Sequence, residues 1–174
     1  RDKHIWKSIW SMHTPQKVKT MLWRACREAL PTKQALVRRK VIEVSDCERC
    51  CNSTENSLHA LWQCPELDPV WENAEWGFRS SVQFLDFKQL WSWLVMQKKD
   101  IELFAVTVWM IWNQRNRVRL NIPAESLHQL AHTARTWLLE FQRRNVVRAP
   151  QVQQETHRTR SRWKPPRSEF LKIN

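Results

Sequence analysis

The stretch CERCCNSTENSLHALWQCP, residues 47–65, decides the fold that we expect for this chain. Cys47 and Cys50 form a Cys-x2-Cys pair, and His59 and Cys64 follow as a His-x4-Cys pair after eight intervening residues. Three thiols and one imidazole at this spacing are the ligand set of a tetrahedral Zn2+ site. Because protein ligands would fill all four positions, the spacing predicts a structural metal with no open position for catalysis.

The second ligand of this set has an alternative, because Cys51 follows Cys50 directly. We favour Cys50, since the Cys-x2-Cys spacing lets both thiolates converge around one loop, whereas Cys51 would point elsewhere. The remaining thiol, Cys26, lies on the apolar face of a predicted helix. We expect it to be a small buried side chain and neither a ligand nor a nucleophile.

Composition favours helices around the predicted metal site. The chain has 174 residues, of which 42% are hydrophobic, and this is enough for one domain with a core. It has a single Gly, Gly77, which disfavours a sheet with tight hairpins, a P-loop and a dinucleotide-binding loop. Five Cys without a signal sequence indicate a reducing compartment, so we expect a protein that is not secreted.

Tryptophan is unusually frequent, with twelve in the chain. Five of them recur at helical spacing within apolar runs, and we expect these to lie mostly in the core, with base stacking as the lesser alternative. They are Trp23, Trp71, Trp109, Trp112 and Trp137. The most apolar run, residues 103–112, is too short to span a bilayer, so we expect no membrane partner.

Hydrophobic periodicity predicts helices over most of the chain. The first is expected from Pro15 to Leu30, with Thr14 as its cap, and the second is expected to be capped by Thr32 and to run through Arg39. Further helices are expected at residues 57–63, 66–74, 87–98, 101–120 and 123–144, with a brief extended run at 41–44. The predicted fold class is therefore mainly α: a small helical domain with a CCHC zinc-knuckle-like insertion (residues 1–76), a helical extension (77–145) and a basic flexible tail (146–174).

Positive charge flanks the predicted metal site. The net charge is +12, with eleven Lys/Arg against two acids in residues 1–40, five against eleven in residues 41–102 and thirteen against four in residues 103–174. Basic surfaces of this kind meet polyanions, nucleic acid first and anionic membranes second, although single charges are often only a solvated face. The candidate phosphate-binding residues are Lys17, Lys19, Arg24, Arg27, Arg38, Arg39 and Lys40.

Several motifs in this order resemble the zinc-binding region of plant LINE-type (non-LTR) retrotransposon reverse transcriptases. They are IWKSIWSMHTPQKVKTMLWRACREALPTKQALVRRK at residues 5–40, CERC at 47–50, HALWQCP at 59–65 and, more loosely, WMIWNQRNRV at 109–118. That family usually has Gly where this chain has Cys51. The final SRWKPPRSEFLKIN is similar to the stretch that introduces a ribonuclease H domain, and we expect that domain to be missing here.

The resemblance implies a non-catalytic module with Zn2+ as its cofactor, placed between the polymerase and ribonuclease H domains of a polyprotein. We expect it to bind element RNA or target DNA during retrotransposition, with no small-molecule substrate. The implied location is the nucleus, with a cytoplasmic ribonucleoprotein phase. Two alternatives stay open: a structural domain that packs the polymerase against ribonuclease H, and a degenerate element remnant that binds no nucleic acid. A small enzyme is disfavoured because no other residue pattern indicates catalysis.

Overall fold

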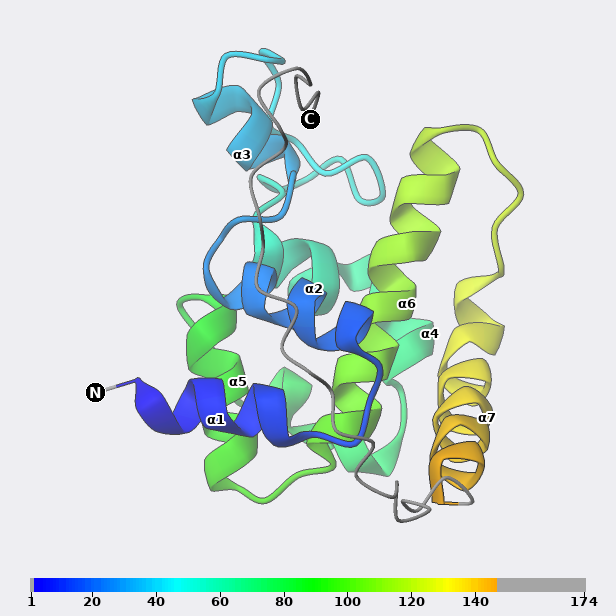
Figure 1. Ribbon diagram of the computed structural model, residues 1–174. Helices are drawn as coiled ribbons and strands as arrows, with labels where there is room; N and C mark the ends of the chain where they lie inside the picture. Colours follow the sequence, from blue (N-terminus) through cyan, green and yellow to red (C-terminus); the bar gives the residue numbers. More distant parts are fainter. Residues whose placement is uncertain (1, 147–174) are drawn as a thin grey trace, which may run out of the picture.

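The computed structural model describes residues 2–146 of the chain as a bundle of helices (Figure 1). The α-helices are α1 (Lys3–Ser11), α2 (Gln16–Cys26), α3 (Lys33–Arg38), α4 (Asp68–Trp71), α5 (Phe87–Met96), α6 (Ile101–Arg119) and α7 (Leu127–Val146). Three further turns are the π-helical η1 (His59–Gln63) and the 3-10 helices η2 (Pro65–Leu67) and η3 (Ala74–Ser80). The mainly α fold class is confirmed. The predicted tail lies, from residue 147 onward, outside the described residues.

The long helices α6 and α7 lie side by side and antiparallel, and α2 crosses against α6 (Figure 1). On the other side α2 packs against α1 and α5. Buried side chains from Ile5 in α1 to Leu138 in α7 form one hydrophobic cluster. Both predicted parts, residues 1–76 and 77–145, contribute to this cluster, while the boundary at residue 76 stays a prediction.

The predicted cap is confirmed at α3, whereas the predicted cap of α2 and the predicted start of α7 are wrong. The Thr32 hydroxyl accepts the Ala35 N–H at 3.2 Å, as predicted. The prediction that Thr14 caps α2 is wrong, because Pro15 occupies the cap position with extended backbone and the buried Thr14 hydroxyl has no partner. α7 begins at Leu127 and not at Pro123, whose carbonyl accepts the Arg117 Nε–H at 2.6 Å within the connecting loop.

Two other elements differ from the periodicity-based expectation. α1 has no counterpart among the predicted helices, although Ile5 and Ile9 lie four residues apart on its buried face. The helix expected over residues 66–74 is instead a 3-10 turn followed by the short α4, which ends at Trp71. Among the described helices, none combines the length and apolar character that crossing a bilayer requires.

An aromatic core connects the predicted metal-binding segment to α6. The rings of Trp62, Trp71 and Trp76 have centroids 5.8, 5.4 and 5.6 Å from that of Phe104. All four side chains are buried, and aromatic pairs at such distances stabilise beyond their buried area. α6 therefore packs, through Phe104, against Trp62, which lies between His59 and Cys64.

Candidate metal centre

A short hairpin presents the first two ligands. The Cys47 N–H donates to the Ser53 carbonyl and the Glu55 N–H to the Ser45 carbonyl, both at 2.8 Å. At the tip, Cys51 has φ of 54°, in the left-handed region that favours glycine. This turn leaves Cys51 exposed and folds Cys50 back toward Cys47.

The π-helical η1 presents the other two ligands. His59 and Cys64 are five residues apart, which in an α-helix would place them about 140° apart around the axis. Here the Cys64 N–H donates to the His59 carbonyl at 3.1 Å, and this i to i+5 bond closes a wider turn. His59 and Cys64 therefore lie on the same side of the chain. The Asn56 side chain fixes the start of the turn by accepting the His59 N–H at 2.7 Å.

The four predicted ligand atoms meet in one cluster, in which all lie within 4.8 Å of one another. The Cys47 and Cys64 sulfurs are 3.9 Å apart, and the Cys50 sulfur is 3.3 Å from His59 Nε2. Two sulfurs bound to one tetrahedral Zn2+ would be separated by about 3.8 Å. The cluster includes Cys50 and excludes Cys51, whose sulfur lies 3.9 Å from the Glu48 carbonyl oxygen.

Protonation also suits a bound cation. Burial lowers the pKa of His59, which keeps the imidazole neutral and able to bind a metal. Burial raises the pKa of Cys64 to about 12, so a thiolate there needs a cation beside it. Burial also raises the pKa of Cys50, but hydrogen bonds from the backbone of Asn52 and Ser53 and from neighbouring thiols bring it below its ordinary value. The donor set fits Zn2+, and a closed set of four would hold it as a structural ion.

Comparison with known proteins agrees with this geometry. Residues 1–71 match the family described as zinc-binding in reverse transcriptase. The resemblance to that zinc-binding region is thereby confirmed. An Arabidopsis thaliana protein named "Putative ribonuclease H protein" is 28% identical over 121 residues, which cover 62% of this chain and 18% of that protein. The chain thus spans about a fifth of the length of this curated relative. No solved structure matches the chain.

Arg49 ties the zinc-binding hairpin to α6. Its guanidinium donates to the carbonyls of Ala60 and Ile111 at 3.0 and 3.1 Å and to the Gln114 side chain at 2.9 Å. Burial lowers the pKa of Arg49, whereas the neighbouring Cys64 and Cys47 raise it. A Zn2+ bound by three thiolates and a neutral imidazole would carry net negative charge, which this guanidinium would offset.

A buried ion pair makes the second connection to α6. Glu55 and Arg115 are 2% and 4% exposed, and the Arg115 Nε–H donates to the Glu55 carboxylate at 3.1 Å while a second guanidinium nitrogen binds its other oxygen. The same carboxylate accepts the Lys33 N–H at 2.9 Å, and the Glu55 carbonyl accepts the Gln34 N–H at 3.0 Å. Glu55 therefore joins the end of the hairpin, the start of α3 and α6. In the sequence, Arg115 stood out only as part of the family-like stretch WMIWNQRNRV at residues 109–118, and this pattern does not indicate that Glu55 is its partner.

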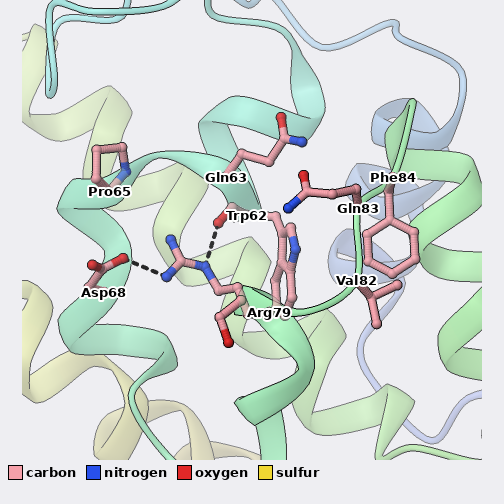
Figure 2. Close-up of a pocket in the computed structure, with 9 residues that line it drawn as sticks. Trp62, Gln63, Pro65, Asp68, Arg79, Val82, Gln83 and Phe84 are labelled. Atoms are coloured by element: carbon pink, nitrogen blue, oxygen red, sulfur yellow. Dashed lines mark hydrogen bonds and ion pairs between the residues drawn. The ribbon is translucent and has the colours of Figure 1, made fainter.

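Arg79, on η3, binds the carbonyls at the end of η1, and Figure 2 shows its contacts with the Trp62 carbonyl and with Asp68. Its Nε–H donates to the Trp62 carbonyl at 2.8 Å, and a terminal nitrogen donates to the Cys64 carbonyl at 2.9 Å. A further nitrogen binds the Asp68 carboxylate. Nothing in the sequence pairs Arg79 with these groups, because the carbonyls of residues 62 and 64 are available only once η1 has ended there.

The predicted phosphate-binding residues lie on α2, at its C-cap, on α3 and in the turn after α3. Six are exposed and Lys19 is half-buried, with its ammonium 3.0 Å from the Trp10 carbonyl. The Arg27 guanidinium lies over the Trp23 ring at 5.9 Å. Within residues 2–146, the ion pairs include none of the seven. Of the five predicted core tryptophans, Trp71 and Trp112 are buried, and the other three are half-buried.

Proposed function

We propose that this chain is a non-catalytic zinc-binding module of a LINE-type reverse transcriptase that binds element RNA or target DNA during retrotransposition. The observation that carries the proposal is the set of exposed basic side chains on α2 and α3 without acidic partners among the described residues. Unpaired Lys and Arg on one part of a surface provide the counterion release that drives phosphate binding.

Two carboxylates of the acidic middle of the chain pair with bases other than the seven candidate residues. Glu48 pairs with Lys33 at 2.9 Å and with Arg119 at 3.4 Å, and Glu55 is buried against Arg115. These carboxylates are engaged in holding the hairpin to α3 and α6. This pairing of the carboxylates supports separate roles for two parts of the chain: zinc orders the hairpin and η1, and the basic residues of α2 and α3 contact phosphates.

The closed ligand set supports a module without catalytic chemistry of its own, since no coordination position is left for water or substrate. Its partners would be RNA or DNA together with the polymerase and ribonuclease H domains of the same polyprotein. Its location would be the nucleus, with a cytoplasmic ribonucleoprotein phase.

A salt series on the zinc-loaded protein tests the proposal. The variant replaces five exposed basics by Gln: Arg24, Arg27, Arg38, Arg39 and Lys40. We expect the slope of log affinity against log salt for a labelled oligonucleotide to fall by about 0.7–0.9 for each phosphate that the variant no longer neutralises. The matched control neutralises three basics that pair with acids elsewhere: Lys88, Arg135 and Arg144. Equal slopes for the wild type and the first variant, with zinc retained in both, would contradict the proposal.

One observation favours the second candidate, a structural domain between polymerase and ribonuclease H. Val118, Leu120 and Ile122, at the end of α6, are 54%, 68% and 42% exposed. Neighbouring exposed apolar side chains suit a protein contact. A zinc-loaded protein that binds no oligonucleotide at low salt would support this candidate.

A further inference from the structure

A row of aromatic rings lies along the contact between α6 and α7, outside the aromatic core. The rings of Trp109 and Trp137 are stacked with centroids 5.4 Å apart and planes at 30°, and Trp137 stacks on Phe141 at 5.9 Å and 11°. His13 adds an edge contact to Phe141 at 6.0 Å. We call Trp109, Trp137 and Phe141 the aromatic strip.

The aromatic strip is half-buried, in contrast to the buried rings around Phe104. Trp109 lies on α6, whereas Trp137 and Phe141 are one helical turn apart on α7. Large rings that are only half-buried keep part of their apolar surface in water, where a flat ligand can cover it. Packing alone does not require Trp at such positions, since a smaller apolar side chain would also seal the helix contact.

A cation faces the aromatic strip. The Lys17 ammonium lies 4.5 Å from the centroid of Trp109 and 5.6 Å from that of Trp137. Beside His13, the Glu102 carboxylate accepts the His13 N–H and the Gln142 side-chain amide. An exposed cation–π contact is weak, so a phosphate can draw the ammonium away and open the ring face.

A hollow continues the aromatic strip along α6. It has a volume of about 340 Å3, and its lining includes Trp109, Asn113, Arg117 and Leu130. Residues 109, 113 and 117 are successive turns of α6 and lie on one face, about 12 Å from end to end. The hollow therefore combines apolar walls with the Asn113 amide, a group that suits a base edge. The Arg117 guanidinium already donates to the Pro123 carbonyl, and Glu125 adds a carboxylate to the lining, so the phosphate contact is assigned to Lys17.

We propose that the aromatic strip and the adjoining hollow bind single-stranded nucleic acid, with bases stacked on Trp109 and Trp137 and a phosphate on Lys17. This inference rests on the proposed function and specifies its ligand. Unpaired bases expose their faces to aromatic side chains, whereas bases in a duplex are already stacked on one another. The strip thus selects single strands, while the basic residues of α2 and α3 hold the backbone of any strand.

Two labelled oligomers of equal length and charge test the site: oligothymidylate and an abasic sugar–phosphate oligomer. We expect the zinc-loaded protein to prefer the oligothymidylate by about tenfold or more. Trp137→Leu should abolish the preference and leave the abasic affinity unchanged. The matched control is Trp6→Leu, since Trp6 is also half-buried beneath a lysine, with the Lys88 ammonium at 6.0 Å. This control should keep the preference.

The outcomes separate this site from the proposed function. Equal, salt-dependent affinity for both oligomers would overturn the stacking site and leave the proposed function standing. No binding of either oligomer, together with no binding of oligouridylate, would overturn both. A preference that survives Trp137→Leu would also overturn the site and assign the strip to protein contacts. If Trp137→Leu weakens the binding of both oligomers, Trp137→Phe is the deciding variant. A restored preference for oligothymidylate supports the stacking site, and an absent preference overturns it.

Discussion

Replacing Arg115 by Met should release the metal, although Arg115 touches none of the four ligands. The change removes two hydrogen bonds to Glu55 and leaves a carboxylate that is 2% exposed without its cation. Breaking a buried ion pair by removing one partner costs about 3–5 kcal/mol. Because a structural zinc site forms only as the chain folds, we expect the apparent zinc affinity to fall by about two to four orders of magnitude.

Competition with a coloured zinc chelator measures the affinity, and denaturant unfolding of the zinc-loaded protein measures the stability. The double variant Glu55→Leu with Arg115→Met should lose less than the sum of the two single changes, because it leaves no buried charge. Arg135→Met is the matched control, since Arg135 pairs with Glu75 but is 56% exposed; we expect a cost below about 1 kcal/mol. An Arg115→Met protein that behaves like Arg135→Met would refute the reasoning.

Three further predictions concern the centre itself. Cys64→Ser should lose zinc and unfold residues 45–65. Cys51→Gly should keep zinc and gain stability, because the φ of 54° at this position favours glycine. Metal analysis and hydrogen exchange over residues 45–65 measure both effects, and a Cys64→Ser protein that keeps zinc or a Cys51→Gly protein that loses it would contradict them. Burial lowers the pKa of His59, so the unfolded chain binds a proton that the folded chain lacks, and stability should fall as the pH drops below about 6.5; unchanged zinc retention down to about pH 5 would contradict this. Arg79→Met should cost about 1–3 kcal/mol in denaturant unfolding, because the Trp62 carbonyl loses its guanidinium donor and the Cys64 carbonyl keeps only the Leu67 N–H. A cost no greater than that of Arg143→Met, on the exposed end of α7, would argue against it.

The metal ligands could be predicted from the sequence because Zn2+ limits both the residue types and their spacing. The Thr32 cap could also be predicted, because capping depends on a local spacing: the N–H donor, on Ala35, lies three residues after Thr32. Local rules did not settle which residue starts α2, because Pro15 can occupy either the cap or the first helical position.

The supports of the centre could not be predicted, because each joins residues that are far apart in the chain. Arg49 reaches Gln114, and Glu55 reaches Arg115, across about sixty residues. The family-like pattern around Arg115 indicates no partner for it, and nothing in the sequence distinguishes Arg49 from the solvated arginines. The half-burial of Trp109 and Trp137 was likewise hidden, since apolar periodicity identifies the side of a helix that packs but not how far the packing extends.

The placement of Arg79, Gln114 and Arg115 has a consequence for dividing this chain into parts. All three lie beyond residue 71, where the match to the zinc-binding family ends, yet they complete the bonding of the hairpin and of η1. A peptide cut at residue 71 would contain every ligand but would leave the buried Glu55 carboxylate without the Arg115 guanidinium and the Cys64 carbonyl without the Arg79 guanidinium. The length of chain that supplies the metal ligands is therefore shorter than the length that must fold to hold the ion.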